Sequence, residues 1–164
     1  MNLFMNLLFK KLMGGSILTV EPKDEHYKEK VISSFKSQKF MNYIGAQLTE
    51  IKPGFCEIQL GYREELSQHD GFFHGGIIGT LADNAGGFAA YSLMPPNTSV
   101  LTVEYKLNIV SPGTGEKLIA HGRVLKPGKT LTTCSSEVYA VNNENKKLCA
   151  TSLMTLITLY SEEK

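Results

Sequence analysis

Asp83 is an isolated carboxylate in a stretch of small and apolar residues that runs from Gly71 to Ala90. Leu81, Ala85 and Phe88 recur at helical spacing, which predicts a helix that faces a core. Steps of three or four residues along this helix also give a second face of small residues with the carboxylate at its centre. A desolvated carboxylate is costly unless it is hydrogen-bonded or charge-paired, and a glycine inside a helix costs roughly 1 kcal/mol relative to alanine. We therefore expect a ligand or another backbone to come close to Asp83.

His74, Gly75 and Gly76 stand where this helix is expected to begin. The first backbone N–H groups of a helix lack partners inside the helix and carry partial positive charge. Glycine lets a ligand approach them closely, which suits an oxyanion hole. The amide of Gln68, in the polar loop before the helix, can reach over the helix start. This set of groups could support acyl transfer, with N–H groups holding a carbonyl oxygen while Asp83 activates water or attacks directly.

These residues, taken in order, resemble the signature of the PaaI-like hotdog thioesterases and the related 4-hydroxybenzoyl-CoA and acyl-CoA thioesterases. The resemblance rests on His74-Gly75-Gly76, then six residues, then Asp83, and on the stretch from Gln68 to Phe73 before them. It spans roughly residues 40–160. It implies an α+β hotdog fold, in which a curved antiparallel sheet of five to six strands wraps one long central helix.

The resemblance also implies a role for each site residue. Asp83 would be the base or nucleophile, and the Gly75 N–H the oxyanion donor. Gln68 would orient water or the thioester, and Thr102 would assist water from the other subunit. The place of His74 at the helix start, before two glycines, suits either a base or a residue that fixes the loop by hydrogen bonding. Further contacts to the acyl group and to the coenzyme A phosphates are expected from Phe73, Gly76, Asn84, Lys126 and Lys129.

The implied reaction is hydrolysis of a small aromatic or medium-chain acyl-CoA to the free acid and coenzyme A, without a metal or other cofactor. Two alternatives stay open. One is a hydratase acting on acyl thioesters, which in related proteins pairs a histidine with an acidic residue at a different spacing. The other is a non-catalytic acyl-CoA-binding hotdog protein, although such sensors lack the acid that stands here at Asp83. Thiol release and enoyl-CoA hydration separate the three.

Composition narrows the class of protein further. The chain has 164 residues, a formal net charge of +1 and 42% hydrophobic residues, which fits one domain with a sizeable core. Basic residues are scattered, so we expect no nucleic-acid partner. Cys56, Cys134 and Cys149 are odd in number and lack metal-ligand spacing, which favours reduced thiols in a cytoplasmic protein.

The order of elements completes the expectation. Residues 1–38 read as an N-terminal extension with a helix and residues 39–164 as the hotdog domain; the apolar run Met1–Phe9 is too short to span a bilayer and is expected to be a docking helix or an extension. A long edge strand favours aggregation unless it is paired, so we expect a homodimer or homotetramer. Helices are expected at 24–37, 40–46 and 74–94, and strands at 48–51, 55–60, 99–110, 116–126, 130–141 and 147–160.

Overall fold

The computed structural model describes residues 20–160, so the apolar run at the N-terminus lies outside the described residues. None of the helices between residues 20 and 160 has both the length and the apolar composition needed to cross a bilayer. The elements lie within a few residues of their predicted bounds. In chain order they are α2 (Tyr27–Ser37), α3 (Lys39–Ile44), β1 (Gln47–Lys52), β2 (Phe55–Gly61), the 3-10 turn η1 (Glu64–Leu66), α4 (Gly75–Tyr91), β3 (Thr98–Ile109), β4 (Lys117–Lys126), β5 (Leu131–Asn142) and β6 (Asn145–Tyr160).

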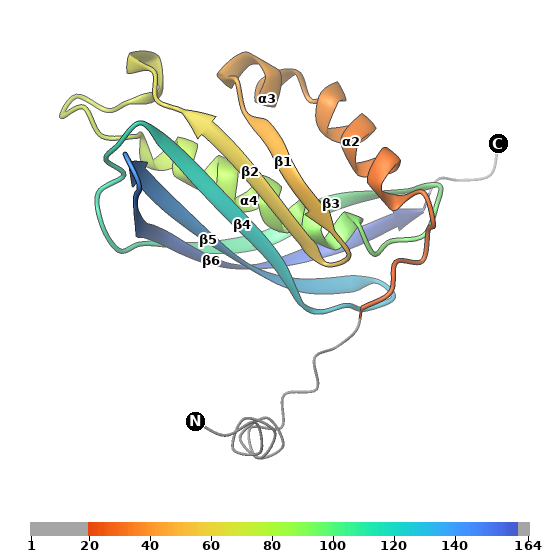
Figure 1. Ribbon diagram of the computed structural model, residues 1–164. Coiled ribbons are helices and arrows are strands. Elements are labelled where there is room, and N and C mark those ends of the chain that lie inside the picture. Colours follow the sequence, from red (N-terminus) through yellow and green to blue (C-terminus); the bar gives the residue numbers. More distant parts are fainter. Residues whose placement is uncertain (1–19, 161–164) are drawn as a thin grey trace, which may run out of the picture.

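The strands form one antiparallel sheet of six, in the order β1-β2-β4-β5-β6-β3. Figure 1 shows this sheet curving around α4, the long helix. Short turns join β1 to β2, β4 to β5 and β5 to β6 because antiparallel neighbours need only a hairpin connection. The predicted α+β hotdog arrangement, one long helix wrapped by a curved sheet, is confirmed.

Close packing of α4 on the sheet explains part of its glycine and alanine content. A Cβ atom on Gly122 of β4 would lie 2.1 Å from the Ala85 carbonyl oxygen, and one on Gly86 would lie 2.1 Å from Sδ of Met154. The apolar face predicted for the helix is buried as expected, with Leu81 and Ala85 fully buried. Small residues on both elements therefore let the helix sit directly on the sheet.

Helix α2 belongs to the same core. Val31 is fully buried, and the ring of Phe35 packs edge to face on Phe88 of α4 with centroids 5.6 Å apart. Lys30 Nζ donates to the Met94 carbonyl oxygen at 2.7 Å and pairs with Asp24 at 2.9 Å, which ties α2 to the end of α4. The division of the chain at residue 38 stays a prediction, but the helix before it is an integral part of the packing.

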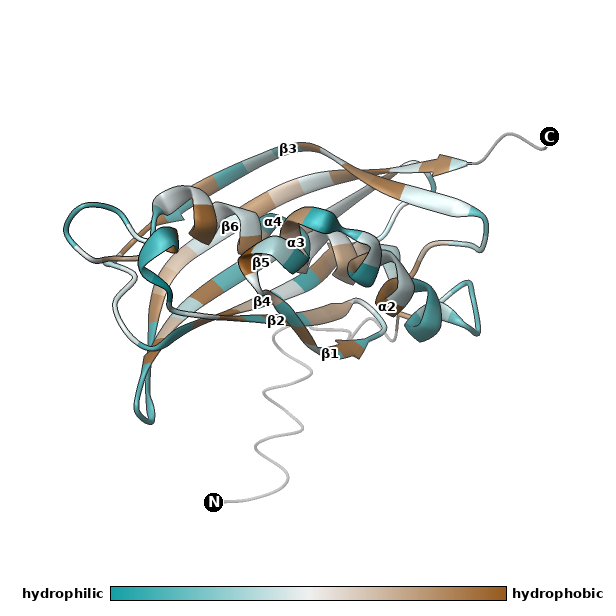
Figure 2. Cartoon of the chain, turned by 90° about the horizontal axis from the view of Figure 1, so that it is seen from above, coloured by the Kyte–Doolittle hydropathy of each residue, from teal (hydrophilic) through white to brown (hydrophobic). Residues whose placement is uncertain are grey.

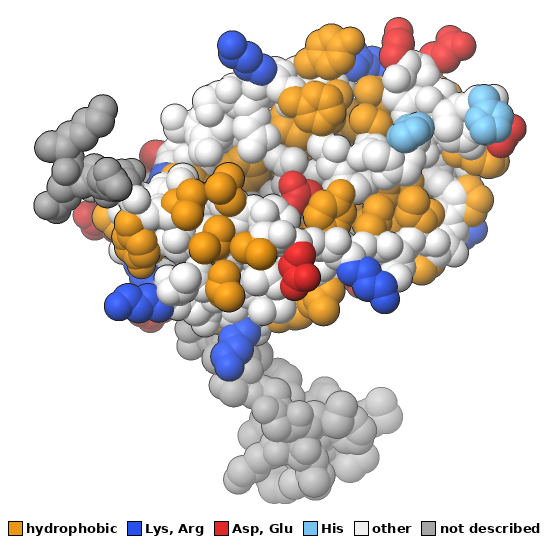
Figure 3. Space-filling view, turned by 180° about the vertical axis from the view of Figure 1, so that it is seen from behind, with side chains coloured by type: hydrophobic (Ala, Val, Ile, Leu, Met, Phe, Trp, Pro, Cys, Tyr) orange, Lys and Arg blue, Asp and Glu red, His pale blue; other side chains and the backbone are white. Residues whose placement is uncertain are grey.

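Strand β3 forms one edge of the sheet and carries exposed apolar side chains. Leu101, Val103, Tyr105 and Ile109 are each about half exposed, between 47% and 57%. The apolar colour along β3 is visible in Figure 2, and Figure 3 shows hydrophobic side chains spread over this side of the molecule. A long apolar edge of this kind is expected to be covered by a partner.

Candidate active site

Asp83 lies at the middle of α4, half-buried, and is bound by a hydroxyl from β3. Thr102 Oγ1 donates a hydrogen bond to Asp83 Oδ1 at 2.6 Å. A β-bulge between Thr102 and Glu104 shifts the pairing of β3 with β6, so that Thr102 and Tyr105 both stand opposite buried residues of β6. A bulge re-aims side chains in this way. The sequence prediction had Thr102 acting from another subunit, whereas here it reaches the carboxylate of its own chain.

The small-residue face of α4 is lined up with β3. Gly75, Gly79, Asp83 and Gly87 follow one another at four-residue spacing, which places them on one side of a helix. A Cβ on Gly79 would lie 3.2 Å from the Tyr105 hydroxyl, and one on Gly75 would lie 3.2 Å from Ile109 Cδ1. The sequence predicted that a ligand or another backbone would come close to this face, and the structure shows that strand β3 of the same chain does so.

A pocket of about 360 Å³ opens beside Asp83 between α2, α4 and β3, and we refer to it as the Asp83 pocket. Asn84 lines it as expected from the sequence, and its amide N–H donates to the Thr80 carbonyl oxygen at 3.0 Å. The part contributed by α2 was not predicted, although the four-residue spacing of Lys30, Ser34 and Gln38 is the signal that could have revealed it. The lining residues are Ser34, Gln38, Asp83, Asn84, Gly87, Phe88, Tyr91, Ser99, Val100, Leu101 and Thr102.

The start of α4 is fixed by His74, its N-cap residue. His74 Nδ1 accepts a hydrogen bond from the Gly76 N–H at 2.9 Å, so the predicted loop-fixing contact of this histidine is present. The Gly76 N–H is thereby engaged and is not free to bind a substrate. The Gly75 N–H, in contrast, has no hydrogen-bond acceptor among residues 20–160. One unpaired donor with the partial positive charge of a helix start is thus available at Gly75.

A second pocket of about 370 Å³ borders this helix start, and we refer to it as the Gly75 pocket. Gln68 lines it, and its side-chain oxygen accepts the Asp70 N–H at 2.6 Å, which leaves the amide N–H₂ for a ligand. Phe73 also borders the pocket but is only 2% exposed and packs edge to face on Tyr62, so its ring serves the core.

The two pockets are separate within one chain. Gly75 and Asp83 are eight residues apart on the same helix, which at 1.5 Å per residue is about 12 Å along the axis. A single thioester carbonyl cannot contact a donor and a base at that separation. The structure therefore does not bring together, in one chain, the two residues that the sequence predicts to act on one carbonyl.

The basic turn between β4 and β5 lies at the level of the Asp83 pocket. Lys126 and Lys129 are exposed and form no ion pair with a carboxylate among residues 20–160. Thr158 of β6 lies between this turn and β3. Its N–H donates to the Thr130 carbonyl oxygen, and on its other side it pairs with Val100 of β3. One strand therefore separates the turn from a residue of the pocket.

The three cysteines are buried and unpaired with one another. Burial raises the pKa of the Cys134 thiol to about 12 and that of Cys149 to about 11, and it also raises the pKa of Cys56. A thiol nucleophile reacts as the thiolate, which is disfavoured at these positions at neutral pH. The structure thus gives none of the three the surroundings of a reactive cysteine.

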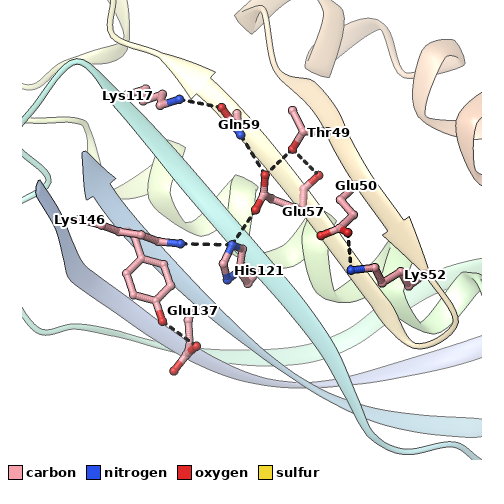
Figure 4. A network of polar contacts seen from close by, with 10 residues as sticks. Thr49, Glu50, Lys52, Glu57, Gln59, Lys117, His121, Glu137 and Lys146 are labelled. Carbon is pink, nitrogen blue, oxygen red and sulfur yellow. Dashed lines mark hydrogen bonds and ion pairs between the residues drawn. The ribbon is translucent and has the colours of Figure 1, made fainter. Parts of the chain in front are cut away.

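A second polar cluster lies on the face of the sheet that points away from α4 (Figure 4). Glu57 accepts hydrogen bonds from Thr49 and Gln59, and its second oxygen lies 2.8 Å from His121 Nε2. Burial alone would raise the pKa of Glu57, but the three hydrogen bonds outweigh it and hold that pKa below its ordinary value. We refer to this cluster as the outer-face network; its members are Thr49, Glu57, Gln59, Lys117, His121 and Lys146.

Comparison with known proteins places the chain in a family. The sequence profile of the Thioesterase superfamily matches residues 70–147. The crystal structure of a thioesterase family protein from Silicibacter pomeroyi is 39% identical and has a TM-score of 0.81, covering 82% of this chain and 99% of that one. Human acyl-coenzyme A thioesterase 13 is 29% identical over 75% of this chain and 87% of its own length.

The fold has a further counterpart in the PaaI protein of E. coli, from the phenylacetic acid degradation operon. Its structure has a TM-score of 0.72 and is 18% identical, covering 81% of this chain and 93% of that chain. The helix that carries Asp83 and the unpaired Gly75 N–H lies within the matched region of the superfamily. The chain belongs to the Thioesterase superfamily, has the hotdog fold and is a thioester hydrolase.

Proposed function

We propose that the protein is an acyl-CoA thioesterase whose substrate is a small aromatic or medium-chain acyl-CoA. The reaction adds water to the thioester carbonyl and releases the carboxylic acid and coenzyme A. The observation that carries the proposal is one helix with an unpaired N–H at its start and a carboxylate, bound by a single hydroxyl, in its middle. The first group suits a developing oxyanion, and the second suits a base or nucleophile.

The site is shared between two copies of the chain. Gly79 lies midway between Gly75 and Asp83 along α4, so a twofold axis near Gly79 sets Gly75 of each copy opposite the partner's Asp83. Isologous contacts of this kind repeat the same pair on both sides of the axis. The 12 Å separation within one chain, about eight helical rises, then becomes the distance between two complete sites in a dimer.

The edge strand supports the same axis. Tyr105 of β3 lies against Gly79, and antiparallel pairing of two β3 strands about Tyr105 would set Glu104 opposite the partner's Lys106. Leu101 would face the partner's Ile109 in the same register, which covers two exposed apolar side chains. Opposite charges and apolar pairs directly across a sheet are both stabilising. The expected assembly is therefore a homodimer or a tetramer of such dimers.

Each group has a defined task in the shared site. The Gly75 N–H, with the Gln68 amide beside it, holds the carbonyl oxygen as negative charge develops. Asp83 either removes a proton from water, which attacks the carbonyl carbon, or attacks it directly to form an anhydride that water then opens. Thr102 holds one carboxylate oxygen and leaves the other free for this step. The proton reaches the departing thiolate in either case, so no metal or other cofactor is needed.

The phosphates of coenzyme A are assigned to the basic turn. Lys126 and Lys129 are exposed, and Thr130 beside them bonds to Thr158, the β6 residue that pairs with Val100 of the Asp83 pocket. Lysine binds phosphate as a point charge, so this contact is expected to lower KM rather than raise kcat. We expect the reaction to take place in the cytoplasm, where acyl-CoA is the partner and no nucleic acid is involved.

Thiol release from a panel of acyl-CoAs tests the proposal. We expect phenylacetyl-, benzoyl- or hexanoyl-CoA to yield free coenzyme A with the wild-type protein and not with Asp83→Asn purified in the same way. Hydration of an enoyl-CoA without thiol release would establish the hydratase alternative instead. Stoichiometric acyl-CoA binding without turnover would establish the non-catalytic one.

A further inference from the structure

We propose that α2 selects the acyl group: Ser34 and Gln38 form a polar wall of the Asp83 pocket and recognise a hydroxyl or oxo substituent on the acyl chain. This inference rests on the proposed thioesterase function and concerns which acyl-CoA the same site prefers. It assigns a specificity role to a helix that precedes the region matched by the superfamily, residues 70–147.

The position of α2 sets its polar side chains against the part of α4 that holds Asp83. Lys30 contacts the Met94 carbonyl oxygen and lies over the Tyr91 ring, and Phe35 packs on Phe88. Later residues of α2 thus meet earlier residues of α4, so the two helices run in opposite directions at this contact. Gln38 directly follows the last residue of α2 and lines the same pocket as Asp83 and Asn84.

The pocket offers hydrogen-bonding groups that residues 20–160 leave unused. The Ser34 hydroxyl, the Gln38 side-chain amide and the Ser99 hydroxyl have no hydrogen-bond partner among the residues that the structure describes. Asn84 adds a side-chain oxygen, because its N–H₂ group is the part that bonds to Thr80. Donors and acceptors therefore stand on both the α2 wall and the α4 wall.

The α2 wall is held firmly. Lys30 is paired with Asp24 at 2.9 Å, and both side chains are largely buried, at 14% and 9% exposure. The same ammonium group donates to two carbonyl oxygens in the segment after α4, of Met94 at 2.7 Å and of Pro95 at 3.1 Å. Specificity by hydrogen bonding needs groups held in place before the substrate arrives, and this anchor supplies that condition.

An unsubstituted alkyl chain would displace water from these groups and return no hydrogen bond. Polar groups that are desolvated without a partner penalise binding, and a site built to bond a substrate hydroxyl discriminates strongly against the analogue that lacks it. Phe88, Val100 and Leu101 still provide apolar contact for the rest of the acyl group. The pocket as a whole is therefore matched to an acyl group that is apolar along its length and carries a polar substituent.

The test compares matched thioesters. We expect kcat/KM of the wild-type protein for 3-hydroxyhexanoyl-CoA or 6-hydroxyhexanoyl-CoA to exceed that for hexanoyl-CoA by about tenfold or more. Gln38→Leu, which keeps the size and removes the polar group, should raise kcat/KM for hexanoyl-CoA, lower it for the preferred hydroxylated ester and so reverse the ratio. Ser34→Ala should reduce the ratio by a smaller factor.

Matched controls separate recognition from damage to the fold. Ser33→Ala on the exposed side of α2 and Gln47→Leu on β1 should leave the ratio of the two kcat/KM values and the thermal midpoint unchanged. Equal kcat/KM for the plain and both hydroxylated esters, or a preference that survives Gln38→Leu in a folded protein, would overturn the inference while the thioesterase function stands. Hydrolysis of phenylacetyl- or benzoyl-CoA but of none of the three hexanoyl esters would also overturn the inference. Hydrolysis of none of these five thioesters would instead overturn the proposed function.

Discussion

Asp83 and Glu57 are both partly buried carboxylates bound by hydroxyl groups, yet the protein surrounds them differently. Glu57, on the outer face of the sheet, takes hydrogen bonds from Thr49 and Gln59 and contacts His121. Asp83, on α4, takes one hydrogen bond, from Thr102, and borders a pocket. A carboxylate with several donors has its acceptor capacity filled, whereas Asp83 keeps an oxygen for water or substrate.

A carboxylate next to a histidine is therefore not enough to identify the active site. The Glu57–His121 pair resembles an acid–base dyad, but its imidazole lies between the rings of Phe55 and Tyr139, with centroids 5.6 and 5.4 Å away. The filled hydrogen-bonding capacity of Glu57 and the packed rings around His121 indicate a pair that holds strands together. Asp83, with free acceptor capacity beside a pocket, is a group that can react.

The largest expected effect is a loss of activity in one of two isosteric variants. Asp83→Asn should lower kcat by about 10²- to 10⁴-fold, because an amide neither accepts a proton nor attacks a carbonyl. Glu57→Gln should leave kcat within about twofold of wild type, because a substitution away from the active site acts on stability rather than on the reaction. Both are measured by thiol release, alongside thermal unfolding. An active, folded Asp83→Asn variant, or an inactive but stable Glu57→Gln variant, would reverse the roles assigned to the two carboxylates.

A second prediction concerns where each carboxylate acts: Glu57 within its own sheet, Asp83 on a substrate held by the partner copy. Asp83→Asn and Gly75→Pro should each be inactive alone. Mixed subunits should regain about a quarter of wild-type activity, because half of the dimers are mixed and each has one site with both groups intact. The mixture is unfolded, refolded together and assayed against each variant treated alike. Mixed dimers without activity would show that the two residues do not share a site across the interface.

Much of this arrangement could be read from the sequence because local rules dominate it. The stretch after His74 predicted α4, since apolar spacing, glycines and the Pro95 stop agree on a helix. Strands β4, β5 and β6 alternate clearly between buried and exposed residues, so their bounds were close as well. The carboxylate and the histidine cap stood out by their residue types and spacing alone.

Features that depend on tertiary pairing could not be read in the same way. The bulge after Thr102 is set by the register between β3 and β6, and it puts Tyr105 rather than Glu104 on the face of β3 that carries Thr102. The polar wall of α2 depends on how that helix crosses α4, and Glu57 meets His121 only because β2 pairs with β4. Spacing along one strand or helix does not encode contacts between elements.

The smallest expected effect is on stability, and its sign follows from the pKa of Glu57. Hydrogen bonds hold that pKa below its ordinary value of 4.5, so the folded state favours the ionised form more than the unfolded state does. The resulting stabilisation is present above pH 4.5 and is lost as the pH falls through the lower, folded-state pKa. Glu57→Gln should therefore lower the free energy of unfolding by about 1 kcal/mol at pH 7, with the difference shrinking toward zero on acidification.

Glu50→Gln is the matched control, because Glu50 and Lys52 form an exposed ion pair within β1, the strand next to β2, and such pairs contribute little. Urea unfolding of the three proteins at pH 7, 5, 4 and 3, at one protein concentration, measures the differences. A deficit of Glu57→Gln that stays constant or grows as the pH falls would mean that its carboxylate is not stabilised by the outer-face network. The contrast between a structural and a reactive carboxylate would then rest on activity alone.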